Sequence, residues 1–291
     1  MKELVILSGK GGTGKTSLTA SFATLADGCL LCDADVDAAD LHLLMQPTIL
    51  KRADFQGGGV AVIDPRRCTG CGTCVDMCRW SAIGSDFVVD EIACEGCGVC
   101  VDFCPEQAID FPVKTCGQWF ISDTRFGPMV HARLGIAEEN SGKLVTLVRQ
   151  QAKLLAEKKG LELIITDGPP GVGCPVIASV GGATSVLLVA EPTVSGIHDM
   201  ARAISLCQHF KVPVMVCINK HDLNLENSTV IERMAREQGL PVVGRIPFHP
   251  AFTLAMVRGR TLLEYDGNGP VGDQLRHVWT TIMHTPAMTA D

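Results

Sequence analysis

The sequence decides its fold near the N-terminus, in the stretch Gly9-Lys10-Gly11-Gly12-Thr13-Gly14-Lys15-Thr16. This stretch satisfies every fixed position of the phosphate-loop pattern G-x-x-x-x-G-K-[ST]. The apolar run 4–7 before it predicts a buried strand, and residues 16–23 after it predict the start of a helix. A chance glycine-rich turn is the alternative, but the order of strand, loop and helix favours a site for nucleotide phosphates.

The loop is expected to bind phosphate through its backbone. Its glycines let N–H groups turn toward a polyphosphate, and the helix N-terminus adds a partial positive charge. Lys15 is expected to reach the β- and γ-phosphates, and the Thr16 hydroxyl to bind Mg²⁺. The predicted nucleotide-binding residues of this region are Gly9, Gly11, Gly12, Thr13, Gly14, Lys15, Thr16 and Ser17.

Length and composition limit the classes of protein to which the chain can belong. The 291 residues are 46% hydrophobic and 20% charged, which predicts a globular chain with one large and one small domain. The net charge of −7 gives no electrostatic support for a nucleic-acid partner. The chain begins directly with a predicted core strand and holds no apolar run of membrane-spanning length. We therefore expect a cytoplasmic protein that does not bind membranes.

The cysteines predict a metal-binding domain, because fourteen cysteines in a reducing compartment favour metal ligation over disulfides. Eight of them form two copies of one unit, offset by 26 residues: Cys68, Cys71, Cys74 and Cys78, then Cys94, Cys97, Cys100 and Cys104. This double spacing resembles a bacterial two-cluster ferredoxin and implies two [4Fe–4S] clusters. We expect an inserted ferredoxin domain, 57–113, within a larger domain of residues 1–56 and 114–291, with Gly57-Gly58-Gly59 as a hinge.

The resemblance to ferredoxins also implies the ligand sets, because the fourth cysteine of each run serves the other cluster. The first cluster would take Cys68, Cys71, Cys74 and Cys104. The second cluster would take Cys94, Cys97, Cys100 and Cys78. Arg79 follows Cys78 where ferredoxins usually have proline, and its positive charge would favour the reduced cluster.

Two predicted strands end in acidic residues. Strand 29–32 is followed by Asp33, Asp35 and Asp37, and strand 161–166 is followed by Asp167. Acidic groups at the carboxyl ends of parallel strands face the ligand crevice of an open α/β sheet, where Asp167 would hold a water molecule bound to Mg²⁺. The alternative for the first group is three solvated loop carboxylates.

Two details narrow the family. Lys10 is a second lysine in the loop, and this K-G-G-x-G-K-T form resembles the deviant phosphate loop of the ParA, MinD, Mrp and nitrogenase iron protein superfamily. The segment Asp167-Gly168-Pro169-Pro170-Gly171 is similar to the Mrp and MinD branch. The resemblance implies a doubly wound, mostly parallel α/β sheet with an inserted α+β ferredoxin domain. It also implies ATP hydrolysis by a homodimer in which Lys10 reaches the nucleotide of the other subunit.

The same resemblance implies roles for single residues. Asp35 would orient the attacking water. Asn219 would recognise adenine, which favours ATP over GTP, and Pro247 would lie in a second loop that contacts the base. The expected catalytic residues are Lys10, Lys15 and Asp35. The expected Mg²⁺ ligands are Thr16, Asp33 and Asp167.

The cysteines outside the repeat are expected to serve other purposes. Cys29 and Cys32 point to opposite faces of a strand and are expected in the core. Cys174 lies seven residues after Asp167, an offset similar to that of an interface cluster ligand in the nitrogenase iron protein. Cys116 is the only spare cysteine nearby upstream, so we expect a structural or transient role for Cys174.

The stretch 117–140 is the hardest part to interpret. Residues 125–128 and 133–135 predict loops, and a helix is expected over 143–159. Further on, Thr229 and Glu232 predict a capping box that opens another helix.

Two functions are left open. In the first, ATP rearranges the dimer, and the clusters supply electrons to a partner metalloprotein or to the assembly of its metal cofactor. In the second, the chain is a dedicated carrier or scaffold for clusters or metal, with no electron-transfer role. Closed ligation by four thiolates favours electron transfer, whereas the Asp-Gly-Pro-Pro-Gly segment favours the assembly branch. We prefer a combination in which the ATPase supplies electrons to cofactor assembly, and a ParA-like partitioning role is disfavoured by the negative charge.

Overall fold

The computed structural model describes residues 1–135 and 141–289 and divides into two compact units. Of the described residues, the first unit contains 1–52, 119–133 and 141–289, and the second contains 53–118, 134 and 135. Two strands, β3 (Thr48–Gly59) and β6 (Val113–Thr124), carry the chain from one unit to the other. The domain bounds predicted from the sequence remain a proposal.

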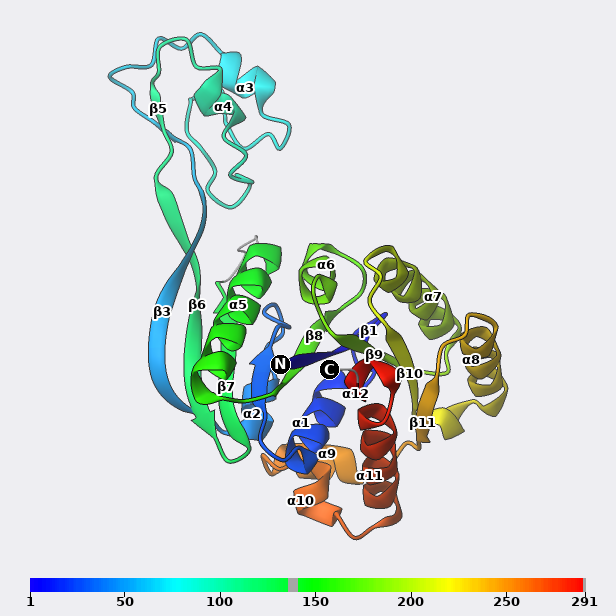
Figure 1. Cartoon of the computed structure of the whole chain (residues 1–291). Coiled ribbons are helices and arrows are strands. Elements are labelled where there is room, and N and C mark those ends of the chain that lie inside the picture. Colours follow the sequence, from blue (N-terminus) through cyan, green and yellow to red (C-terminus); the bar gives the residue numbers. More distant parts are fainter. Residues whose placement is uncertain (136–140, 290–291) are drawn as a thin grey trace. The chain divides into compact units, whose positions relative to one another are not determined.

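The first unit is built on a sheet whose strand order is β11-β10-β9-β1-β8-β2-β7-β6-β3 (Figure 1). Its other strands are β1 (Lys2–Ser8), β2 (Leu30–Asp33), β7 (Gly127–Leu134), β8 (Leu163–Pro170), β9 (Ser185–Ala190), β10 (Val214–Asn219) and β11 (Val242–Ile246). Strand β1 pairs in parallel with β8 and β9, and parallel pairing continues through β2 to β7 and through β10 to β11. This is the mostly parallel α/β sheet that the phosphate loop predicts.

Helices cover both faces of this sheet (Figure 1). They are α1 (Lys15–Leu25), α2 (Leu41–Met45), α5 (Ser141–Lys159), α6 (Cys174–Val180), α7 (Val194–His209), η1 (His221–Leu223), α8 (Leu225–Glu237), α9 (Ala251–Val257), α10 (Leu262–Asp266), α11 (Pro270–Met283) and α12 (Pro286–Thr289). The predicted helix 143–159 is therefore confirmed as α5.

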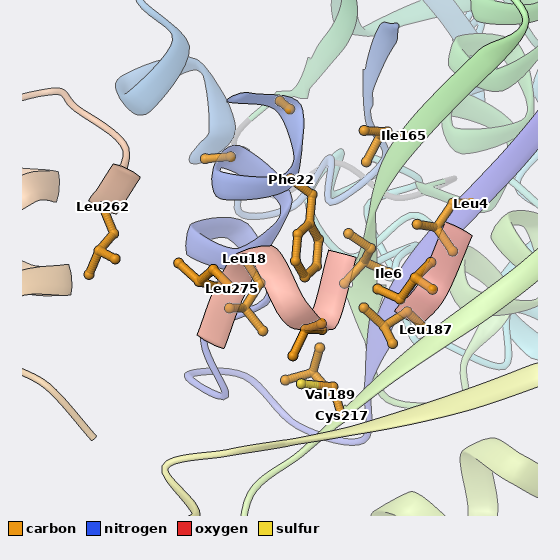
Figure 2. Packing of buried hydrophobic residues seen from close by; sticks show 14 of the residues in the cluster. Leu4, Ile6, Leu18, Phe22, Ile165, Leu187, Val189, Cys217, Leu262 and Leu275 are labelled. Atoms are coloured by element: carbon orange, nitrogen blue, oxygen red, sulfur yellow. The ribbon is translucent and has the colours of Figure 1, made fainter. Parts of the chain in front are cut away.

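Apolar side chains of β1 alternate between two cores, one on each face of the sheet. Leu4 and Ile6 belong to the core that contains Phe22 of α1 (Figure 2). Val5 and Leu7 belong to the core formed with α6, α7 and α8. Because helices cover both faces, β1 is a continuous apolar run and does not alternate with polar residues.

Two local predictions are wrong, and a third is right only in part. Of the expected loops at 125–128 and 133–135, Arg125 and Phe126 form the turn between β6 and β7, whereas residues 127–128 and 133–134 belong to β7. The expected hinge 57–59 is the end of β3. Helix α8 begins four residues before Thr229, because the Asn224 side chain accepts the Asn227 N–H at 2.9 Å and caps it. Residues 136–140 of the difficult stretch lie outside the described residues.

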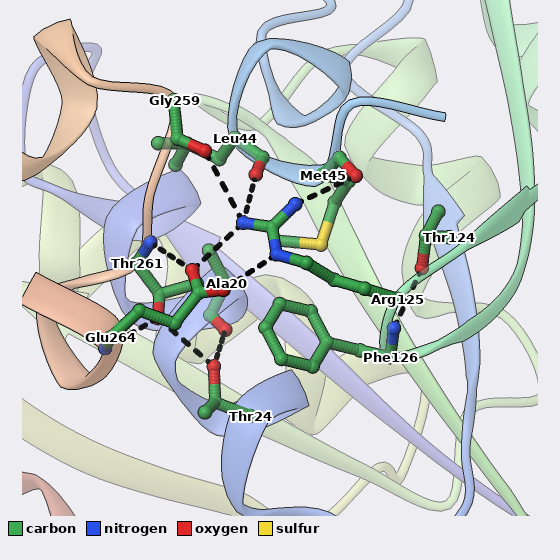
Figure 3. A network of polar contacts seen from close by, with 10 residues as sticks. All are labelled: Ala20, Thr24, Leu44, Met45, Thr124, Arg125, Phe126, Gly259, Thr261 and Glu264. Atoms are coloured by element: carbon green, nitrogen blue, oxygen red, sulfur yellow. Dashed lines mark hydrogen bonds and ion pairs between the residues drawn. The ribbon is translucent and has the colours of Figure 1, made fainter. Parts of the chain in front are cut away.

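Arg125, in the turn between β6 and β7, ties three segments of the first unit together (Figure 3). Its guanidinium group donates to the carbonyl groups of Leu44 and Met45 at 2.7 and 2.9 Å, at the end of α2. It also donates to both carboxylate oxygens of Glu264, at 2.6 and 2.8 Å, and to the carbonyl group of Gly259. The contacts hold the turn against the end of α2 and the start of α10.

Replacing Arg125 with alanine is expected to lower the free energy of unfolding by about 2–3 kcal/mol, because a carboxylate and several carbonyl groups lose a charged donor. Urea unfolding measures this change. The matched control is Arg133→Ala, which removes an exposed arginine of β7 and should change stability by less than about 0.5 kcal/mol. Equal effects at the two positions would contradict the structural role of Arg125.

The second unit has a small core and two copies of one backbone turn. Helices α3 (Thr73–Met77) and α4 (Val99–Asp102) each follow a left-handed glycine, Gly72 with φ 83° and Gly98 with φ 74°. A short antiparallel pair joins β4 (Val62–Ile63) to β5 (Ile109–Asp110). The buried core residues are Ala61, Cys74, Ile83 and Ile109. A core this small usually needs a further link, such as a bound metal, to be stable.

Candidate functional site

The phosphate loop lies between β1 and α1, at the carboxyl ends of the central strands. Gly14 has φ 93°, and a Cβ atom there would stand 2.4 Å from Nδ2 of Asn219. That Nδ2 donates to the carbonyl group of Thr13 at 2.7 Å. Only glycine at position 14 therefore allows the end of β10 to approach the loop so closely.

Lys15 and three carboxylates form one buried cluster. Lys15 is buried, and its Nζ lies 3.8 Å from Oδ2 of Asp35. Asp33 and Asp167 are buried and stand opposite each other in the register of β2 and β8. Oδ1 of Asp167 accepts the Thr19 hydroxyl at 3.1 Å, and Oδ1 of Asp33 accepts the Asp35 N–H at 3.2 Å. The predicted catalytic lysine and all three predicted carboxylates thus meet in one place.

The remaining oxygen of each buried carboxylate, Oδ2 of Asp33 and Oδ2 of Asp167, has no hydrogen-bond partner among the described residues. Burial, followed by the charge of Asp167, raises the pKa of Asp33 well above its usual range. Burial likewise raises the pKa of Asp167, and it raises that of Asp35 to about 6 even though Lys15 lowers it. Ionised carboxylates without partners are costly to bury, so this arrangement suits a bound cation with oxygen ligands, such as Mg²⁺.

A separate open pocket adjoins the loop. Its lining residues are Gly14, Ser17, Asn219, Lys220, Pro247, Phe248, His249, Phe252, Thr253 and Met256. Because Nδ2 of Asn219 is engaged with the loop, its buried Oδ1 has no hydrogen-bond partner in the described chain and can accept from a ligand. The fold brings together Asn219 and Pro247, which are predicted to contact the base.

Lys10 contacts its own chain in this structure. Its Nζ donates to the Thr193 hydroxyl at 3.1 Å and lies 3.6 Å from Glu191. Its predicted reach to a second subunit therefore stays a prediction.

In the second unit, the four cysteines predicted for the first cluster line one small hollow. They are Cys68, Cys71, Cys74 and Cys104. Three come from the first run and one from the second, so residues from both repeats meet there. Ile63, Phe87 and Ile109 are among the apolar residues that complete the lining.

Of the cysteines predicted for the second cluster, Cys94, Cys97 and Cys100 lie near one another. Cys78, Cys94 and Cys100 pack against the small core, while Cys97 is exposed. Burial raises the pKa of Cys100, and the neighbouring thiols of Cys94 and Cys97 raise it further. The Sγ atom of Cys78 accepts the Ala82 N–H at 3.3 Å, and in the equivalent place Cys104 accepts the Ala108 N–H at 3.3 Å.

Within residues 1–135 and 141–289, no group of three or more His, Cys, Asp or Glu side chains is placed to hold a single ion. A [4Fe–4S] cluster binds each of its four thiolates to a different iron, so its ligands stand further apart than those of one ion. All fourteen cysteines are free of disulfides, and the donor set around the hollow fits such a cluster.

Comparison with known proteins identifies the family. Residues 4–262 match the family described as the CobQ/CobB/MinD/ParA nucleotide binding domain. The chain belongs to this family. It is 31% identical over 280 residues to the uncharacterized protein MJ0578 of Methanocaldococcus jannaschii, an alignment that covers 95% of each chain.

Solved structures of the family share the fold. The septum site-determining protein MinD of Pyrococcus horikoshii, solved with Mg-ADP, superposes with a TM-score of 0.61 at 15% identity. The superposition covers 97% of this chain and 95% of that one. It agrees with an α/β P-loop fold around a mostly parallel sheet. Because proteins of the MinD/ParA family hydrolyse ATP, this chain is an ATPase.

A shorter match is to the cytosolic Fe-S cluster assembly factor NUBP2 homolog of Nematostella vectensis. It is 26% identical over 139 residues, which is 43% of this chain and 52% of that protein.

No helix in the described part of the chain has the length and apolar character needed to cross a membrane.

The sequence analysis did not identify two charged residues that lie beside the phosphate loop. Glu191 follows β9 and lies 3.6 Å from both Lys10 and Lys220. Lys220 donates to the carbonyl group of Gly12 in the phosphate loop at 2.9 Å. The available signal was the position of each residue directly after an apolar strand, the same signal that singled out Asp33 and Asp167.

The other cysteines have distinct environments. Cys29 and Cys32 are fully buried, as expected for core residues, and burial raises the pKa of Cys29 to about 12. Cys174 is exposed at the first residue of α6. Cys116 is buried in the second unit, where its thiol donates to the carbonyl group of Gly57 at 2.8 Å.

Proposed function

We propose that this ATPase couples ATP-driven rearrangement of a homodimer to electron supply for a metal or iron–sulfur cofactor that is built or loaded on a partner protein. One observation carries the proposal. Within an ATPase chain, four cysteines from two sequence repeats line one hollow of a second unit, with a donor set that fits a [4Fe–4S] cluster. We assign Cys68, Cys71, Cys74 and Cys104 to this cluster, and Cys94, Cys97, Cys100 and Cys78 to a second.

In the nucleotide site, each residue has a separate task. Lys15 would neutralise charge on the terminal phosphates, and Lys10 would do so from the second subunit. Asp35 would orient the attacking water, for which its buried position beside Lys15 is suitable. Mg²⁺ held by Thr16, Asp33 and Asp167 would neutralise charge on the β- and γ-phosphates.

The chain offers a direct route between the nucleotide and the cysteines. Asp35 precedes α2, and α2 leads into β3, which enters the second unit. The other strand that enters it, β6, ends at Thr124, beside Arg125. Because Arg125 binds the end of α2, a shift of the acidic segment would act on both connecting strands.

The second candidate is a dedicated cluster or metal carrier without an electron-transfer role. It is favoured by the partial similarity to the NUBP2 homolog, which is named as an assembly factor. The two candidates differ in what happens to iron, because a carrier gives up its clusters while an electron donor retains them.

An anaerobic redox titration followed by EPR distinguishes these candidates. The reduced protein is titrated without nucleotide, with Mg-ADP and with Mg-ATP, and its iron content is measured before and after each titration. We expect Mg-ATP, but not Mg-ADP, to shift the cluster potentials or signals while the iron content stays constant. Identical titrations in all three conditions would overturn the electron-supply proposal and leave the carrier function.

A further inference from the structure

The loop after β11 forms part of the pocket beside the phosphate loop. Pro247, Phe248 and His249 all line this pocket, together with Asn219. Phe248 is half exposed although it lines the pocket, so its aromatic ring is available to a flat ligand. A loop that contributes three lining residues needs a fixed position if the pocket is to select its ligand.

One hydrogen bond from another segment holds this loop. The Phe248 N–H donates to Oδ1 of Asp222 at 2.6 Å. Asp222 lies in the short helix η1, which follows the end of β10 after a single residue, Lys220. The turn is closed by Lys220, which has φ 55° and whose carbonyl group accepts the Leu223 N–H at 3.1 Å. The same turn therefore presents Asn219 to the pocket and holds the loop on its other side.

We propose that Asp222 is a positioning residue for the nucleotide base, acting through the Phe248 N–H and never touching the base. The inference rests on the proposed role of this pocket as the base site. Asp222 is not among the residues that line the pocket, and its Oδ1 is occupied by the loop.

This arrangement also determines which base the pocket accepts. With Asp222 engaged, Oδ1 of Asn219 is the buried side-chain acceptor of the pocket that has no partner within the described residues. The exocyclic amine of adenine can donate to it, whereas guanine presents an acceptor oxygen at that position. A carboxylate facing the pocket would accept from the N1–H and N2–H groups of guanine, but the residues that line the pocket include no Asp or Glu, and Asp222 lies outside that lining.

The test compares the wild type with Asp222→Ala and Asp222→Asn. Affinities for Mg-ATP, Mg-GTP and Mg-tripolyphosphate are measured by calorimetry, after thermal melting has shown that the variants are folded. We expect the Asp222→Ala variant to bind Mg-ATP with about tenfold lower affinity than the wild type. Its affinity for tripolyphosphate, which has no base, should not change. Asp222→Asn keeps an acceptor oxygen and should bind Mg-ATP within about threefold of the wild type.

Two results would overturn the inference: an unchanged Mg-ATP affinity in Asp222→Ala, or an equal loss for Mg-ATP and tripolyphosphate. A different result would overturn the base pocket itself. If the wild type binds tripolyphosphate but does not prefer Mg-ATP to Mg-GTP, the pocket does not distinguish the two bases. The assignment of the base pocket and the role of Asp222 would then both be wrong.

Discussion

Replacing Lys15 with alanine is expected to slow ATP hydrolysis by at least about 100-fold, because the variant loses the ammonium group that we assign to the terminal phosphates. The ammonium group is buried beside Asp35, and burial strengthens its interaction with phosphate. The measurement is phosphate release under saturating Mg-ATP.

The matched control for this prediction is Lys158→Ala, which removes an exposed lysine near the end of α5. This control should retain the wild-type rate. Circular dichroism of Lys15→Ala separates loss of catalysis from loss of fold. A folded variant that still hydrolyses ATP within about tenfold of the wild type would exclude the assigned role of Lys15.

Replacing Cys104 with alanine is expected to remove the cluster of the first cysteine run and to leave the other cluster in place. Iron should fall from about eight to about four atoms per chain. The reason is spatial, because Cys104 lines the hollow formed by Cys68, Cys71 and Cys74 although it follows Cys100 in the sequence. Iron analysis and EPR of the reduced protein measure the loss.

The sharpest form of this test compares four variants. Cys104→Ala should lose the same EPR signal as Cys74→Ala, and Cys78→Ala the same signal as Cys100→Ala. The control Cys174→Ala, in the first unit, should retain all its iron. If Cys104→Ala instead matched Cys100→Ala, the ligand sets would not cross between the repeats, and our assignment would be wrong.

The central part of the fold could be predicted because its signals are local. Residues 4–7 read as a buried strand, and they are one, because apolar side chains at consecutive positions require cover on both faces. The strands that end in Asp33 and Asp167 were predicted for the same reason. The hairpin of β6 and β7 was missed because glycine and proline at 127 and 128 indicate a loop, whereas pairing with β2 makes the segment a strand.

By itself, the sequence determined the phosphate loop and the mostly parallel sheet and predicted the chemistry of the cysteine repeats, because each depends on residue types at short, fixed spacings. Tertiary structure decided which distant side chains meet. It placed Arg125 on the end of α2, Glu191 between two lysines, and Asp222 on the backbone of Phe248. It also brought Cys104 to the hollow of the first run. Such contacts join residues far apart in the chain, and only the packing of the strands and helices sets their distances.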